Sequence, residues 1–236
     1  MPAKKLPDTD ENRIEALQTI IHQEERAGEK NVLSLIDIHN LRNFLLSYEG
    51  AIACVQQALN DETGTAKNCL QLFQNARLYI AHFIQVLYLA TIRNEVKPEN
   101  LTFYGLEEYS DNFDIPDLST EEAVIEWGER LINGEATRMS QGGTAIYNPA
   151  ITKVKVHYDL FKEAVYSLKI YRQNTVRARS GLENVQDKAD SLIWAAWTKV
   201  EFAYGALPVE ERDPKYKDYG ICFYHQRGGE QLNVFD

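Results

Sequence analysis

The sequence is poor in the residues and runs that mark several large classes of protein. Among its 236 residues there are only 3 cysteines, at positions 54, 69 and 222, and none forms a Cys-x-x-Cys pair. An odd number without that spacing argues against a disulfide framework and a zinc knuckle. No apolar run approaches the roughly 20 residues that cross a bilayer. The first residues also lack the apolar segment of a secretory signal. We therefore expect a cytoplasmic protein with free thiols and no membrane partner.

Motifs that carry catalysis or bind nucleotides are also missing. The sequence has no Walker A, dinucleotide-binding, nucleophile-elbow or zinc-protease pattern. Histidines occur at positions 22, 39, 82, 157 and 225, and none follows a glutamate by three residues, as a di-iron bundle requires. Because these histidines fall on different helix faces, we predict no metal and no cofactor. No catalytic residue can be assigned.

Apolar residues at spacings of three and four are abundant, and they predict helices that pack along a seam. Four such segments occur, at residues 38–59, 69–90, 151–168 and 182–204. Polar stretches at residues 61–65 and 179–181, each with or next to a glycine, would join them as two antiparallel pairs. The sequence therefore predicts an all-α fold, a four-helix bundle of up-down hairpins.

A long crossover, residues 95–149, joins the two hairpins and should be partly helical. Ser119 and Glu122 form a capping-box pattern that begins a short helix through Leu131. Residues 10–27 can form an amphipathic helix at the N-terminal end. We divide the chain into an N-terminal extension, residues 1–30, and a single helical-bundle domain, residues 31–236.

The last part of the chain differs from the helical pattern. Residues 219–226 (Tyr-Gly-Ile-Cys-Phe-Tyr-His-Gln) are rich in strand-forming residues and predict a short C-terminal β-strand. A lone strand is unstable, so it needs a partner. Residues 101–104 of the crossover are one candidate, and a strand of another protein or of a second copy is the alternative.

The formal net charge of −10 is local. Residues 95–135 hold twelve acids and two bases, so this segment carries the whole excess. Residues 150–181 have a net charge of +5, and Lys155, Lys162 and Lys169 repeat every seven residues. This basic stripe could contact nucleic acid. We expect instead that the acidic crossover lies across it, which argues against a nucleic-acid partner.

A few residues near the predicted seams are candidates for a ligand site. Arg172 occupies a seam position, where an unpaired charge is costly, so we expect a pair with Asp190 rather than a ligand-binding arginine. Glu201 lies one position from the Trp197 and Tyr204 face and could be a half-buried acid or base. Seam aromatics usually form core, although a pocket lined by them would suit a small ligand. The candidate ligand-binding residues are Arg172, Glu201, Trp197, Tyr204 and Tyr166.

Several short motifs lie along the chain from about residue 35 onward. They are residues 103–106 (Phe-Tyr-Gly-Leu), 122–128 (Glu-Ala-Val-Ile-Glu-Trp-Gly), 134–138 (Gly-Glu-Ala-Thr-Arg), 142–143 (Gly-Gly), 148–149 (Asn-Pro) and 219–224 (Tyr-Gly-Ile-Cys-Phe-Tyr). In these motifs the sequence resembles a group of uncharacterised bacterial helical-bundle proteins with no assigned function. The resemblance implies a helical bundle with a decorated crossover, and it supplies no catalytic residues.

Together these features favour a non-enzymatic interaction or scaffold protein built on a four-helix bundle. It would present its acidic crossover and C-terminal strand to a protein partner or to a second copy of itself. The alternative is a small-molecule-binding bundle, or an enzyme, with a pocket lined by tyrosine and tryptophan. Binding of nucleic acid through the basic helix is the weakest of the three hypotheses.

Overall fold

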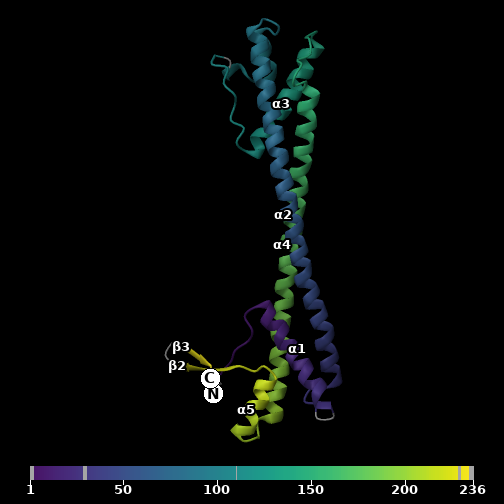
Figure 1. Ribbon diagram of the computed structural model, residues 1–236, viewed down its shortest axis with the longest axis vertical. Helices are drawn as coiled ribbons and strands as arrows, with labels where there is room; N and C mark the ends of the chain where they lie inside the picture. The colour runs from purple at the N-terminus through teal and green to yellow at the C-terminus, as the bar shows by residue number, and fades with distance from the viewer. Residues whose placement is uncertain (1–2, 29–30, 110, 228–229, 234–236) are drawn as a thin grey trace. The chain divides into compact units, whose positions relative to one another are not determined.

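The structure is a computed structural model that describes residues 3–28, 31–109, 111–227 and 230–233. It is predominantly α-helical (Figure 1). The α-helices are α1 (Asp10–Ala27), α2 (Leu35–Ile92), α3 (Glu121–Ser140), α4 (Ile151–Tyr204) and α5 (Val209–Asp218). The 3-10 helices η2 (Pro98–Tyr104) and η3 (Glu107–Tyr109) precede α3. The strands are β1 (Ala3–Lys4), β2 (Phe223–Arg227) and β3 (Glu230–Asn233).

The four-helix bundle is wrong in its connections, because α2 and α4 are each one continuous helix. Gly64 and Gly181, which we placed in turns, lie inside these helices with open space where a Cβ would be. One glycine costs a helix about 1 kcal/mol, which is too little to end it when flanking residues pack. The apolar pattern itself continues through the first predicted turn, since Leu59, Ala66 and Cys69 keep the seam spacing. The four predicted apolar seams therefore form two long seams, one along α2 and one along α4.

The chain divides by its contacts into two compact units. Unit 1 consists of Met1–Ala58 and Thr175–Asp236, and unit 2 consists of Leu59–Asn174. Helices α2 and α4 each contribute one part to unit 1 and the other part to unit 2. Each unit completes its own hydrophobic core with elements that the other lacks.

In unit 1, α1 packs against the first part of α2 and the last part of α4. Thr9 caps α1 by accepting a hydrogen bond from the backbone N–H of Asn12 at 3.2 Å. Leu17 and Ile20 of α1 are fully buried. The helix predicted at residues 10–27 is confirmed, but it belongs to the core of unit 1, so the contacts place no boundary near residue 30.

The strands of unit 1 form an antiparallel sheet in the order β1-β2-β3. Ala3 lies opposite Tyr224 in the pairing of β1 with β2, and the backbone N–H of Lys5 donates to the carbonyl of Cys222 at 3.0 Å. Residues 101–104, the candidate strand partner in the crossover, lie in η2 instead. Their backbone closes local 3-10 turns and therefore offers no strand edge.

Helix α3 begins at Thr120, whose hydroxyl accepts a hydrogen bond from the backbone N–H of Ala123 at 3.1 Å. The cap is thus one residue later than Ser119 of the predicted capping box. The helix also continues to Ser140, well past the predicted end at Leu131, because its buried face continues.

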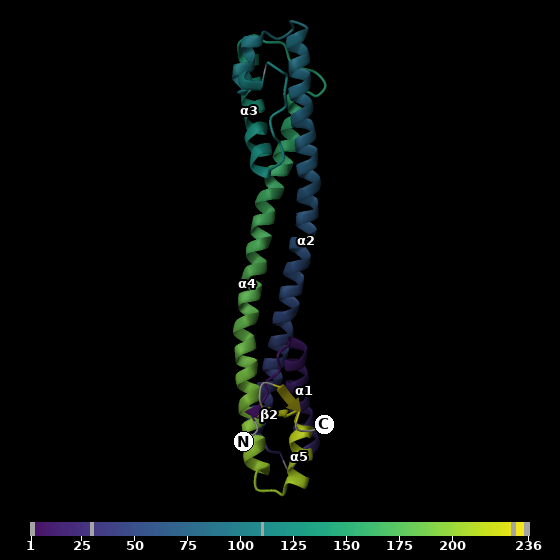
Figure 2. The same cartoon turned by 90° about the vertical axis from the view of Figure 1, so that its left-hand side faces the viewer.

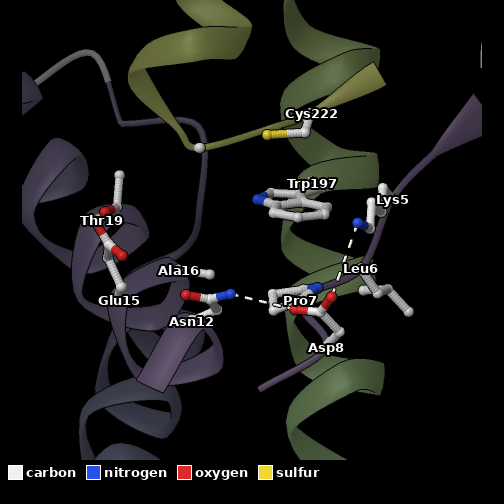
Figure 3. Close-up of a pocket in the computed structure, with 11 residues that line it drawn as sticks. Lys5, Leu6, Pro7, Asp8, Asn12, Glu15, Ala16, Thr19, Trp197 and Cys222 are labelled. Carbon is white, nitrogen blue, oxygen red and sulfur yellow. Dashed lines mark hydrogen bonds and ion pairs between the residues drawn. The ribbon is translucent and has the colours of Figure 1, made fainter. Parts of the chain in front are cut away.

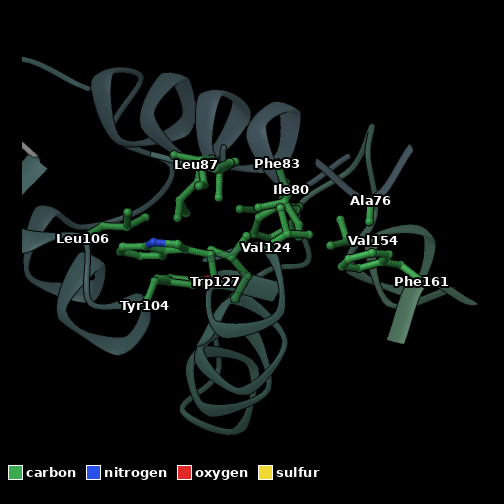
Figure 4. Packing of buried hydrophobic residues seen from close by; sticks show 14 of the residues in the cluster. Ala76, Ile80, Phe83, Leu87, Tyr104, Leu106, Val124, Trp127, Val154 and Phe161 are labelled. Carbon is green, nitrogen blue, oxygen red and sulfur yellow. The ribbon is translucent and has the colours of Figure 1, made fainter. Parts of the chain in front are cut away.

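Helix α3 lies alongside α2 and α4 in unit 2 (Figure 2). Its residues Val124 and Trp127 join a core that includes Phe83 of α2 (Figure 4). Gly128 allows this close approach, since a Cβ at that position would lie 2.4 Å from the Tyr158 ring of α4. The acidic crossover therefore supplies the third helix of unit 2.

Among the residues that the structure describes, no ion pair joins the lysines of the α4 basic stripe to the crossover, contrary to the prediction. Lys155 forms an ion pair with Asp159 of its own helix at 2.8 Å, and Lys162 donates to the Tyr158 hydroxyl at 3.3 Å. That hydrogen bond raises the pKa of Lys162, and Glu129 of α3 adds a weaker electrostatic contribution. The lysines of the stripe therefore bind acidic and hydroxyl groups of α4 itself, because i, i+4 partners lie closest on a helix.

Candidate functional site

A cavity of about 380 Å³ opens in unit 1 beside Trp197 of α4 (Figure 3). Residues 5–8 form one wall, α1 forms another, and Gly220 and Cys222 complete the lining. The lining residues of α1 are Asn12, Glu15, Ala16 and Thr19. The volume is within the range of small-molecule sites, about 300–1,000 Å³.

The segment at residues 5–8 is fixed at both ends. Lys5 is bonded to the Cys222 carbonyl, and Thr9 caps α1 directly after the segment. Gly220, on the opposite wall, has a φ of +72°, a left-handed conformation that favours glycine. A Cβ there would lie 3.7 Å from Thr19, so the loop and α1 approach closely. The backbone on both sides of the cavity is therefore fixed in position by these contacts.

Charged groups of both signs border the apolar wall of the cavity. Asp8 accepts a hydrogen bond from the Asn12 amide at 3.2 Å, and its carboxylate is 3.8 Å from the Lys5 ammonium. The hydrogen bond from Asn12 chiefly, with Lys5 adding to it, lowers the pKa of Asp8. Glu15 brings a second carboxylate, and among the described residues it forms no ion pair. The rim therefore carries two carboxylates and one ammonium group, a net charge of −1.

Trp197, a predicted ligand residue, lines this cavity but is itself almost fully buried. Its indole N–H donates to the Tyr219 carbonyl at 3.0 Å. Tyr204, another predicted residue, is half-buried, and its ring centroid lies 6.4 Å from that of Tyr219. Both residues therefore pack around Tyr219, and only Trp197 reaches the cavity.

Glu201 is occupied by an ion pair rather than free for acid–base chemistry. Lys4 of β1 lies 2.6 Å from its carboxylate and also donates to the Thr198 hydroxyl at 3.1 Å. The same ammonium sits 4.0 Å above the centre of the Trp194 ring. The Lys4 side chain is largely buried by these contacts, so Glu201 anchors the N-terminal strand.

Arg172 and Tyr166 belong to unit 2, whereas the other predicted site residues belong to unit 1. Arg172 is exposed, with its guanidinium 3.9 Å from Glu62 of α2. Tyr166 is also exposed and lines neither the cavity nor a core. The five predicted residues are therefore divided between the two units.

The predicted pair between Arg172 and Asp190 is wrong. Asp190 instead binds Arg13 of α1, with contacts of 2.7 and 3.1 Å from two guanidinium nitrogens. The chain does not reverse at Gly181, so Asp190 lies farther along the same helix as Arg172. Helix α1, which the predicted bundle left outside its core, supplies the arginine.

Helix α3 carries a buried pair of opposite charges that was not predicted. Arg138 donates to Glu135 at 2.8 Å and to the Tyr104 hydroxyl at 2.8 Å, and Tyr104 in turn donates to Glu135. Arg138 also reaches the Thr144 carbonyl at 2.7 Å. Burial, followed by the bond to Glu135, raises the pKa of Tyr104. The available signal was the i, i+3 pair of opposite charges on the apolar side of a helix.

Unit 1 contains a comparable group, the buried carboxylate of Glu24. It accepts the backbone N–H groups of Val32 and Leu33 at 3.1 and 3.2 Å and the Tyr219 hydroxyl at 2.8 Å. Burial and the bond to Glu24 raise the pKa of Tyr219. In the Glu24 and Glu135 clusters the polar atoms form hydrogen bonds with other groups of the chain, so the clusters hold chain segments together.

Residues suited to a metal or to covalent chemistry are not gathered in the part of the chain that the structure describes. No group of three or more histidine, cysteine, aspartate or glutamate side chains could hold a metal ion there. Cys54, Cys69 and Cys222 are free thiols, and burial raises the pKa of Cys69. None of the described helices combines the length and apolar character needed to cross a membrane.

The second surface of interest is on α2 in unit 2. Leu78, Leu89 and Ile92 are 63%, 50% and 57% exposed. They share one side of the helix, because separations of 11 and 14 residues are about three and four turns. We call this the α2 outer face. The exposed polar residues His82 and Gln85 lie between Leu78 and Leu89 on this side, so the face is mixed in polarity. Residues 63–92 contain Lys67 and Arg77 and no acid.

No protein-family model, curated protein or solved structure matches this chain. Its function is therefore inferred from its own geometry. The cavity beside Trp197 and the α2 outer face are two surfaces that offer a binding partner contacts. The buried clusters of Glu24 and Glu135 offer none, because their polar groups are already paired.

Proposed function

We propose that this protein is a non-enzymatic cytoplasmic interaction protein that binds a protein partner through the α2 outer face. The observation that carries this proposal is the exposure of Leu78, Leu89 and Ile92 on one side of a helix. Covering a leucine or isoleucine side chain contributes about 1.5–3 kcal/mol. Leu89 and Ile92 are i, i+3 neighbours, and Leu78 is a separate apolar contact point three turns before Leu89.

The state of the ionisable groups supports binding rather than catalysis. Glu135 and Arg138 satisfy each other, Glu24 is satisfied by backbone and tyrosine, and Glu201 is paired with Lys4. A general base or nucleophile needs a group that can reach a substrate. These groups face other parts of the chain instead, so they favour a structural role.

The test is site-specific photo-crosslinking in the cells that make the protein. A benzoylphenylalanine replaces Leu78 or Leu89, and the control replaces Leu46, which is 70% exposed in unit 1. We expect a discrete protein adduct from positions 78 and 89 that position 46 does not give. If neither position gives an adduct above the level of Leu46, the proposal is wrong.

A second candidate function, small-molecule binding, is favoured by the cavity beside Trp197. Leu6, Ala16 and Trp197 give it an apolar wall, and at its rim the carboxylates of Asp8 and Glu15 outnumber the Lys5 ammonium by one. This combination suits a small amine with an apolar body. Phenethylamine should bind in calorimetry more tightly than the neutral 2-phenylethanol, and Glu15→Gln should reduce that preference. Equal binding of the two compounds, or none, would remove this candidate.

A further inference from the structure

We infer that residues 3–8 form a strap that opens and closes the cavity beside Trp197, and that the side chain of Lys4 is the latch that holds it closed. We call this segment the cavity strap. As a device that regulates binding, the strap rests on the proposed small-molecule function of the same cavity. The latch itself is testable without any ligand.

The cavity strap forms one wall of the cavity. Lys5, Leu6, Pro7 and Asp8 all line it, and α1 forms another wall (Figure 3). If the strap left this position, Trp197 and the lining residues of α1 would border an open surface. The volume of about 380 Å³ therefore depends on where the strap lies.

The Lys4 side chain attaches the strap to one stripe of α4. Its ammonium lies 2.6 Å from the Glu201 carboxylate, 3.1 Å from the Thr198 hydroxyl and 4.0 Å above the centre of the Trp194 ring. These three positions are spaced i, i+4 and i+7, so they share one side of the helix. The Lys4 side chain is only 8% exposed. The latch is therefore one side chain in a site that α4 provides.

The backbone contributes little to holding the strap. Strand β1 has only two residues, and the next bond to β2 is the one from the Lys5 N–H to the Cys222 carbonyl. Among the described residues, the backbone of positions 6–8 forms no hydrogen bond to backbone groups, and Pro7 has no N–H to donate. Segments with so few backbone bonds open locally at low free energy.

The far end of the strap provides a fixed point for this opening. The Thr9 hydroxyl caps α1 by binding the Asn12 N–H, a contact that does not involve the strap. Asp8 is held by the Asn12 amide and lies 3.8 Å from Lys5, but both charged side chains are about half exposed or more, so this pair contributes little. Release of Lys4 therefore frees residues 3–8 as one unit.

Opening of the strap and occupancy of the cavity are linked. A ligand that contacts both Trp197 and the strap binds the closed form, so it lowers the population of the open form by the factor 1 + [L]/Kd. Neither Lys4 nor Glu201 lines the cavity. The latch thus controls access without being a ligand contact.

The experiment is limited proteolysis of the full chain with trypsin, scored by mass spectrometry as cleavage after Lys5. Glu201→Gln removes the charge that holds Lys4 and keeps both lysines of the strap. It should speed this cleavage at least about fivefold, because cleavage follows the population of the open form. Lys4→Met should do the same, since Lys5 remains available to the protease.

Two controls restrict the effect to the strap. Glu25→Gln removes an exposed ion pair with Arg42 in the same unit, and it should leave cleavage after Lys5 unchanged. Cleavage after Arg13, inside α1, reports opening of the unit as a whole and should be equally slow in all variants.

Phenethylamine tests the link to the cavity. At ten times its calorimetric Kd it should slow cleavage of the wild-type chain after Lys5 about tenfold. Phenethylamine that binds without slowing this cleavage would overturn the inference, because the ligand would then not need the closed strap.

The latch and the small-molecule function fail in different ways. Equal cleavage after Lys5 in the wild type and in Glu201→Gln would overturn the latch, whether or not phenethylamine binds. Cleavage after Arg13 that rises together with cleavage after Lys5 would also overturn it, since the whole unit would then be opening. Faster cleavage after Lys5 alone, with no binding in calorimetry, would support the latch and remove only the small-molecule function.

Discussion

Each unit buries one carboxylate almost completely, and the two units satisfy it differently. Glu135 in unit 2 faces Arg138 and Tyr104, both on buried positions. Glu24 in unit 1 has only neutral donors within the described chain, namely two backbone N–H groups and the Tyr219 hydroxyl. Both carboxylates are 1% exposed, so the difference lies in the partners and not in the burial.

The comparison shows how a buried charge can fix a connection. Glu135 also accepts the backbone N–H of Ile146, and Arg138 holds the Thr144 carbonyl, so this pair pins the loop before α4. Glu24 binds residues 32 and 33 and thereby pins the link between α1 and α2. Removing one member of a buried ion pair leaves the other charge buried without a partner. Removing one of several neutral donors leaves the remaining hydrogen bonds to the carboxylate in place.

The largest expected effect is that of Glu135→Ala. It leaves the Arg138 guanidinium buried without its carboxylate, which costs about 3–5 kcal/mol of unfolding free energy. Chemical denaturation measures this loss. Glu126→Ala on the same helix is the control, because the Glu126–Arg130 pair is exposed and contributes about 0–1 kcal/mol. Equal losses in the two variants would contradict the role of the buried pair.

A smaller effect is expected for Tyr219→Phe in unit 1. The change removes one hydrogen bond from Glu24 and leaves the two backbone donors, so the cost should be about 1–3 kcal/mol. Tyr166→Phe is the control, since this exposed hydroxyl should change stability by less than about 0.5 kcal/mol. If Tyr219→Phe lowered the unfolding free energy as much as Glu135→Ala, the two buried carboxylates would not differ in how strongly they depend on a single partner.

Much of the helical content could be predicted, because seam spacing reports directly which side of a helix is buried. The limits of α1 were predictable, since Thr9 is a good N-cap and Leu17 and Ile20 fall on one face. The predicted turns failed because a glycine in a polar stretch weakens a helix without ending it. Gly64 lies in such a stretch, and the spacing on either side of it was already in register.

The candidate site was harder to predict, because its contacts join residues far apart in the chain. Trp197 was recognised as an aromatic of the seam, but its neighbour Cys222 and the segment at residues 5–8 meet it only in the folded chain. Asp190 forms its ion pair with Arg13, which is 177 residues away in the chain, and not with Arg172. Spacing along one helix gives no information on such pairs.

The smallest expected effect tests what the two units share, the continuous helices α2 and α4. Gly64→Ala in unit 2 and Gly181→Ala in unit 1 should each stabilise the protein by about 0.5–1 kcal/mol, because alanine favours a helix interior and both sites have open space. In a turn with a left-handed glycine, the same change would destabilise instead. Gly134→Ala is the contrasting control on α3, since its Cβ would lie 2.6 Å from the Phe103 carbonyl and should destabilise unit 2. Equal gains at Gly64 and Gly181 would show that both positions lie in the interior of a continuous helix, α2 in one case and α4 in the other.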